Sequence, residues 1–242
     1  MGIPVIHGII DRRLLVNYRV DPDVMAGVLP APSRPKVVGA YAIGGICLIR
    51  LKKMRPNFLP IPFGLGSENA AHRIAVEWRD KGVLREGVYV PRRDTNSRLN
   101  RLVGARVFSG RYHQASFSVQ ETNDAVCVSL KSRDGKTRLH VSGRVGSDLS
   151  ASSVFSSLAQ ASAFFESGSL GYSATPWDGR YEGIELRCTN WKVEPFDVEE
   201  VESSFFNDQT CFPPGSTAFD CALLMRGMDH EWHAREDLCC RS

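Results

Sequence analysis

Three consecutive segments in the middle of the chain alternate apolar and polar residues. They are ASFSVQE at 115–121, AVCVSLKS at 125–132 and TRLHVSGRV at 137–145. Turn-forming residues fill both gaps, at 122–124 and at Asp134-Gly135. A period of two places the apolar side chains on one face of a strand, and short turns join antiparallel strands. The sequence therefore predicts an antiparallel meander with one face in a core.

Strand signals recur on both sides of this meander. The segment 37–54 is apolar and rich in β-branched residues around Gly44 and Gly45, which favours a long buried strand with a bend. A turn at 80–82 separates two further alternating runs, and prolines and glycines predict a loop at 55–67. Strands are predicted at 12–20, 37–54, 72–79, 86–93, 181–196 and 218–227.

A few short helices are predicted between these strands. Asp21 is typical of an N-cap, and Pro22 then occupies the first helical position. Helices are predicted at 21–30, at 94–106 with Asp94 or Thr95 as the cap, at 150–166, and at 197–206 as a short acidic helix. Glycines and serines predict a turn at 167–173. These elements indicate one α+β domain over 1–242, mostly antiparallel, with a core at 10–225 and a polar tail at 226–242.

The charge balance argues against a nucleic-acid partner. The chain has 30 Lys and Arg against 27 Asp and Glu, a formal net charge of +3, whereas phosphate-binding domains show a denser basic face. The first residues lack the basic and apolar regions of a signal peptide, and no apolar run approaches about 20 residues. We expect a cytoplasmic protein without a membrane partner.

The cysteines and histidines do not form a recognisable metal motif. Seven cysteines occur without CxxC spacing, which favours reduced structural thiols. In DHEWH at 229–233, His230 and His233 are three residues apart, whereas the metalloprotease helix needs four. We therefore expect a solvated C-terminal segment and no metal. Neither a GxSxG elbow nor a dinucleotide fingerprint is present, so no cofactor is expected.

One cluster of cationic and titratable residues stands out, in GARVFSGRYHQASFSV at 104–119. It places Arg106, Arg111 and His113 within eight positions, where a predicted helix meets a predicted strand. Guanidinium groups that point into one region repel each other unless an anion lies between them. Glu68 is an available internal partner, and a carboxylate-bearing ligand is an external one. The spacing alone leaves open the alternative that the arginines lie on solvated faces.

The order of the motifs resembles the acetoacetate decarboxylase-like superfamily, and within it the family of domain of unknown function 2071. The resemblance covers about residues 10 to 225. It rests on YRVDPDVMAGVLPAP (18–32), SENAAHRIAV (67–76), DTNSRLNRLVGARVFSGRYHQASFSV (94–119), FFESGSLGYS (164–173) and YEGIELRCTNWKVEPFDVEEV (181–201). It implies a twisted, mostly antiparallel sheet closed into a cone or barrel around a buried pocket, with short helices outside, and it is compatible with a homo-oligomer.

The resemblance also carries implications for chemistry. The decarboxylases form a Schiff base on a lysine whose pKa is lowered by a neighbouring ammonium group. The match puts His113 at the place of this lysine and Gln114 at the place of its neighbour. Neither an imidazole nor an amide forms a stable iminium, so acetoacetate decarboxylase activity is not expected. The second active-site glutamate of the family falls near Gly44 and Gly45, where nothing titrates.

Other family positions match residues of suitable chemistry. Arg106 matches a helix-end arginine, Glu68 a cavity glutamate, and either Arg12 or Arg13 a cavity arginine. The first hypothesis is a pocket that binds or transforms a small anionic, carboxylate-bearing organic molecule, with His113 and Glu68 in acid–base roles. Its ligand contacts would be Arg106, Arg111, Arg12 and Gln114. The second hypothesis is a non-catalytic ligand-sensing or interaction protein, and the sequence does not decide between them.

Overall fold

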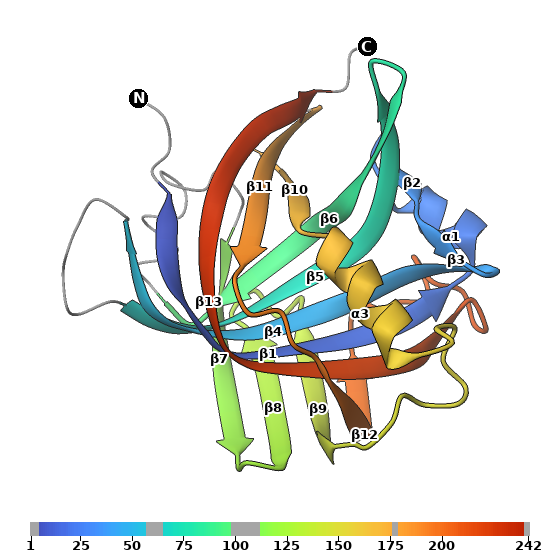
Figure 1. Cartoon of the computed structure of the whole chain (residues 1–242). Coiled ribbons are helices and arrows are strands. Elements are labelled where there is room, and N and C mark those ends of the chain that lie inside the picture. Colours follow the sequence, from blue (N-terminus) through green and yellow to red (C-terminus); the bar gives the residue numbers. More distant parts are fainter. Residues whose placement is uncertain (1–4, 57–64, 98–111, 176–178, 240–242) are drawn as a thin grey trace.

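The computed structural model describes residues 5–56, 65–97, 112–175 and 179–239 (Figure 1). Within these ranges no helix has the length and apolar character needed to cross a membrane. The helices are α1 (Pro22–Gly27) and α3 (Leu158–Ser167). The strands are β1 (Ile6–Val20), β2 (Arg34–Pro35), β3 (Val37–Val38), β4 (Tyr41–Pro56), β5 (Leu65–Asp80), β6 (Val83–Thr95), β7 (Tyr112–Glu121), β8 (Ala125–Ser132), β9 (Arg138–Val145), β10 (Leu170–Ala174), β11 (Arg180–Cys188), β12 (Glu194–Ser203) and β13 (Thr217–Cys239).

The strands form one mixed sheet that closes on itself twice. A ring of nine strands runs in the order β6, β7, β8, β9, β12, β13, β1, β4 and β5, and closes because β5 pairs with β6. A second ring of seven strands forms because β10 joins β6 to β11 and β11 pairs with β13. The two rings share β13, β1, β4, β5 and β6. The closed, twisted sheet implied by the family resemblance is confirmed, as is the β7–β8–β9 meander.

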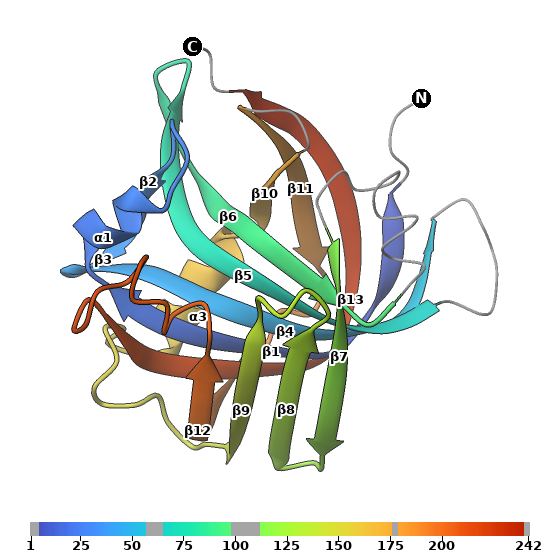
Figure 2. The ribbon, with the colours of Figure 1, turned by 180° about the vertical axis from the view of Figure 1, so that it is seen from behind.

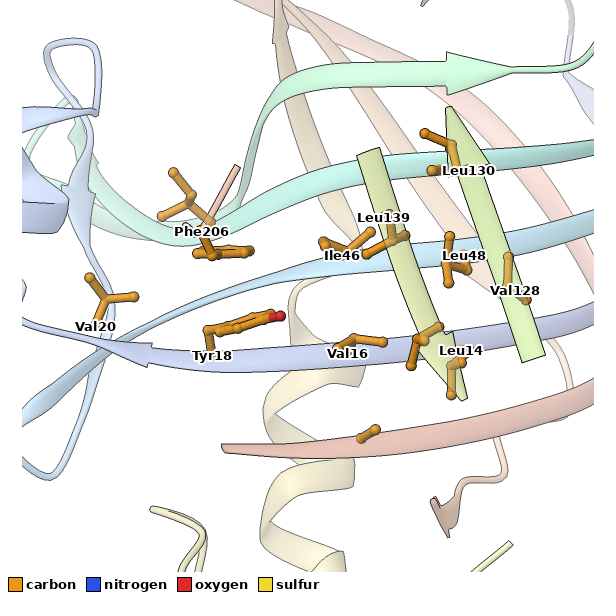
Figure 3. Close-up of a cluster of buried hydrophobic side chains, with 14 of the residues drawn as sticks. Leu14, Val16, Tyr18, Val20, Ile46, Leu48, Val128, Leu130, Leu139 and Phe206 are labelled. Atoms are coloured by element: carbon orange, nitrogen blue, oxygen red, sulfur yellow. The ribbon is translucent and has the colours of Figure 1, made fainter. Parts of the chain in front are cut away.

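The shared strands carry a different hydrophobic core on each face. In β1, Leu14, Val16 and Tyr18 face the nine-strand ring, where they pack with residues of β4, β8 and β9 (Figure 3). Leu15 faces the opposite side and belongs to a second core with Phe165 of α3. Two opposite views show α3 and the β7–β9 meander on opposite sides of β1 and β4 (Figures 1 and 2). Alternation along β1 thus separates two interiors.

The first helix forms as the sequence predicts. The Asp21 carboxylate accepts hydrogen bonds from the backbone N–H groups of Asp23 and Val24, and Pro22 begins the helix. The third predicted helix is shorter than expected, because it begins only at Leu158, with Ser157 as its N-cap. Residues 150–157 form turns, since Asp220 accepts hydrogen bonds from the Ser153 hydroxyl and the Val154 N–H.

The predicted acidic helix at 197–206 is wrong, because residues up to Ser203 belong to β12. A register shift between Val198 and Glu200 inserts an extra residue into this strand. Val198 and Val201 both pack against the core of the nine-strand ring. The bulge therefore puts the valines three residues apart, a spacing that imitates a helix.

Three other predictions are corrected by strand pairing. Asp94 and Thr95 end β6 instead of capping a helix, and the rest of that predicted helix lies outside the described residues. The predicted turn at 167–173 contains the start of β10. The polar segment after 225 is not a solvated tail, because β13 continues to Cys239 and pairs with both β1 and β11. His230 is accordingly only 1% exposed.

Two buried histidines make stability depend on pH. Burial lowers the pKa of His72 to about 3 and that of His230 to about 4. Both stay neutral in the folded protein, whereas a histidine of the unfolded chain gains a proton below about pH 6.5. The unfolded state therefore binds more protons between about pH 4 and 6.5, and stability falls as the pH is lowered through this window.

We expect each buried histidine to lower the free energy of unfolding by about 2 kcal/mol between pH 7 and pH 5. Urea unfolding at pH 7, 6 and 5 measures this slope. In His72→Leu the fall should be smaller by about 2 kcal/mol, because leucine takes up no proton. Equal pH slopes in H72L and the native protein would contradict the assignment.

Candidate functional site

A cavity of about 160 Å³ lies within the seven-strand ring. Residues of all seven strands, β1, β4, β5, β6, β10, β11 and β13, line it, together with the C-terminal end of α3. Most of its wall is apolar or aromatic, with Ile49, Val90, Ile184, Leu186 and Trp191 among the contributors. Such a wall with a few polar groups is typical of small-molecule sites.

Arg73 of β5 is the most unusual residue of this wall. It is 6% exposed, and its Nε is buried without a hydrogen-bond partner. Its Nη2 donates to the Asn17 side-chain oxygen, and the guanidinium lies 4.6 Å from the ring centroid of Phe165. A Cβ at Gly45 would lie 2.6 Å from the Val16 carbonyl oxygen and 3.3 Å from Nη2, so the glycine is needed first for the close approach of the β1 backbone. Burial lowers the pKa of Arg73 to about 10, and the side chain stays cationic at neutral pH.

Two further arginines line the same cavity. Arg13 donates from Nε to the Cys47 sulfur at 3.3 Å and lies 5.6 Å from the ring centroid of Trp191. Arg93 lies 5.7 Å from the ring centroid of Tyr112, and its Nη1 is buried without a partner. Among the described lining residues the one carboxylate is Glu166, which is exposed. The cavity therefore carries an excess of positive charge.

Arg12 faces the other interior, so Arg13 is the arginine of β1 that lines the cavity. Arg12 is fully buried and bonds with two carboxylates, Glu68 at 2.6 Å and Glu121 at 3.0 Å. Arg50 contacts the same two carboxylates at 2.5 and 2.9 Å. Glu68 thus belongs to a partly buried ionic network that includes Arg12, Arg50 and Glu121.

His113 and Gln114 begin β7 and have separate partners. The His113 imidazole is 35% exposed and lies 3.2 Å from Asp134, whose pKa is held well below its usual range by hydrogen bonds from Arg92. Gln114 donates to the Asn96 carbonyl oxygen at 2.9 Å, and its own side-chain oxygen is buried without a partner. No hydrogen bond or ion pair among the described residues joins His113 to Glu68. Instead, Tyr112 is the β7 residue that contacts a cavity arginine.

The structure brings together some of the predicted site residues and not others. Arg12 and Glu68 are in contact, while Arg106 and Arg111 lie outside the described residues. Arg73 and Arg93 line the cavity although neither was predicted from the sequence as a site residue. One signal for Arg73 was available: it is a charged residue within a predicted strand, beside Ile74 and Ala75.

Comparisons with known proteins agree with this architecture. The family model of domain of unknown function 2071, described as an uncharacterized conserved protein, matches residues 10–228. A comparison with curated proteins finds no match. Among solved structures, acetoacetate decarboxylase from Legionella pneumophila is similar, with a TM-score of 0.65, 13% identity, and coverage of 97% of this chain and 88% of that one.

Two further structures share the fold. An acetoacetate decarboxylase-like enzyme from Sphingomonas wittichii RW1 has a TM-score of 0.62 and 12% identity, covering 100% of this chain and 94% of that one. The enduracididine biosynthesis enzyme MppR, complexed with pyruvate, has a TM-score of 0.60 and 10% identity, covering 99% and 91%. The family model covers 219 residues of this chain, from 10 to 228, which is most of its length. The chain belongs to the family of domain of unknown function 2071, and its fold is that of the acetoacetate decarboxylase-like proteins.

Proposed function

We propose that the cavity binds a small organic anion through a carboxylate group, with Arg73 and Arg13 as its partners. The observation that carries this proposal is the buried guanidinium of Arg73, which no carboxylate pairs with among the described residues. A buried charge without an opposite charge costs several kcal/mol. A ligand carboxylate would supply the missing charge and form short, strong hydrogen bonds with the guanidinium.

The walls of the cavity favour a compact and partly apolar ligand. Ile49, Val90 and Ile184 contribute aliphatic surface, and Trp191 and Phe165 contribute aromatic surface next to the arginines. Apolar contacts would favour the body of the ligand, while the guanidinium groups would select the charged end. The pyruvate in the MppR structure is a small carboxylate and supports this ligand class.

Binding of a carboxylate by Arg73 and Arg13 needs no Schiff base. All seven lysines of the chain lie in its described part, and none of the residues that line the cavity is a lysine. This observation supports the expectation that the protein does not decarboxylate acetoacetate through an iminium. The acid–base roles of His113 and Glu68 stay predictions. The ligand contacts of Arg12, Arg106, Arg111 and Gln114 also stay predictions.

Matched pairs of carboxylates and amides test the proposal. Thermal unfolding is measured with acetate, pyruvate and benzoate, and with acetamide, pyruvamide and benzamide. A carboxylate present at about 100 times its dissociation constant should stabilise the protein by about 2.7 kcal/mol, whereas the uncharged amide of the same shape should not. Equal effects of acids and amides would reject a carboxylate site. Both a ligand-sensing protein and an enzyme should show this stabilisation by carboxylates. An interaction scaffold without a ligand should show none.

A further inference from the structure

A thiol lies among the arginines of the cavity. Cys47 of β4 is 7% exposed and lines the cavity, and its sulfur accepts a hydrogen bond from Arg13 Nε at 3.3 Å. Cys47 pairs in the sheet with Leu15 of β1 and Ala71 of β5. Arg13 and Arg73 are each two residues from these partners, so their side chains lie diagonally from Cys47 on the same face. The sulfur thus lies between the two strands that supply the guanidinium groups.

We propose that Cys47 is a nucleophilic site of this cavity, selective for carboxylates that carry an electrophilic carbon. The inference rests on the proposed function, because the ligand carboxylate must occupy the cavity first. Its second support is Arg73, a residue of the same cavity wall that is more than nine-tenths buried and whose Nε has no hydrogen-bond partner. A carboxylate bound there would present its neighbouring carbon to the sulfur of Cys47.

The chemistry balances without an oxidant or a reductant. With an α-halo acid, the sulfur forms a bond to the methylene carbon, the carbon–halogen bond breaks, halide leaves, and the thiol proton goes to solvent. With a 2-oxo acid, the sulfur adds to the carbonyl carbon, the carbonyl π electrons move to oxygen, and that oxygen takes the thiol proton. The Arg13 guanidinium gives the developing thiolate a cationic partner in both cases.

The other cysteines supply internal references. Cys188 lines the same cavity, but burial raises the pKa of its thiol. Cys221 lies in the core beneath α3, and burial raises its pKa to about 12. Cys211 is exposed and serves as an ordinary thiol. We expect Cys47 to be alkylated before Cys188 and Cys221 in the folded protein, because the Arg13 guanidinium donates directly to its sulfur.

The test compares iodoacetate with iodoacetamide at pH 7, with the rate at each cysteine followed by peptide mass spectrometry. At Cys211 the two rates define the ratio for a thiol without a carboxylate site. At Cys47 the ratio of iodoacetate to iodoacetamide should be about tenfold higher or more, because the arginines concentrate the anion. Arg73→Met should remove this preference. Arg144→Met removes the same charge from an exposed ion pair and should preserve it.

Cys47→Ser completes the experiment, since it should lose the adduct at position 47 while Cys211 is alkylated as before. An unlabelled Cys47 in the folded protein, or the same ratio at Cys47 and Cys211, would overturn the inference. If benzoate stabilises the protein while Cys47 shows this ordinary behaviour, the nucleophile is rejected and the carboxylate site stands. If no carboxylate stabilises the protein, the proposed function itself fails.

Discussion

Replacing Arg73 with methionine should strongly weaken carboxylate binding with little change in the stability of the free protein. Methionine has a similar length but removes the buried guanidinium. Affinity for benzoate should fall by at least about 30-fold, equivalent to about 2 kcal/mol, because the carboxylate loses its buried cationic partner. The stability of the free protein should change by no more than about 1 kcal/mol, because removal of an unpaired buried charge offsets the loss of the hydrogen bond to Asn17. Urea unfolding with and without benzoate measures both effects.

A loss of benzoate affinity together with unchanged stability distinguishes a ligand-binding arginine from a structural one. An arginine kept for packing or hydrogen bonding would destabilise the free protein when replaced, and the affinity for benzoate would then change little. The matched control is Arg144→Met, which removes an equal charge from an exposed pair with Glu199. R144M should leave benzoate affinity unchanged. Binding of benzoate to R73M with native affinity would refute the assignment.

Replacing Arg12 with alanine should be the most destabilising of the substitutions considered. Arg12 is fully buried, and its removal leaves the carboxylates of Glu68 and Glu121 in a largely buried setting. Removing one partner of a buried ion pair lowers the free energy of unfolding by about 3–5 kcal/mol. We expect about 3 kcal/mol here, because Arg50 still contacts both carboxylates.

Equilibrium unfolding in urea measures this loss directly. Arg144→Ala is the control, because its exposed ion pair with Glu199 should contribute about 0–1 kcal/mol. A loss below about 1 kcal/mol in R12A would mean that the network adds little to stability. Arg12 would then again be a candidate ligand-binding residue.

The strand content of the fold is predictable because alternation and turn residues are local signals. The β7–β8–β9 meander and the long strand β4 follow directly from them. The closure of two rings is not local, because it depends on pairings such as β11 with β13 and β10 with β6. The bulge in β12 further shows how one extra residue turns a strand pattern into a helical one.

The choice between Arg12 and Arg13 illustrates why the site is harder to predict than the fold. A shift of one residue moves a side chain to the other face of a strand. β1 contains a register shift between Ile10 and Arg12 in its pairing with β4. Ile10 consequently packs in the core beneath α3, whereas Leu14 packs in the nine-strand ring, although both positions are even. Counting along the sequence does not detect this shift.

A crystal structure of the protein with benzoate bound tests the carboxylate site most directly. We expect benzoate in the seven-strand ring, with a carboxylate oxygen about 2.7–2.9 Å from a guanidinium nitrogen of Arg73 and with Arg13 as the second cation. Benzoate bound only elsewhere, or Arg73 paired with a carboxylate of the protein itself, would contradict it.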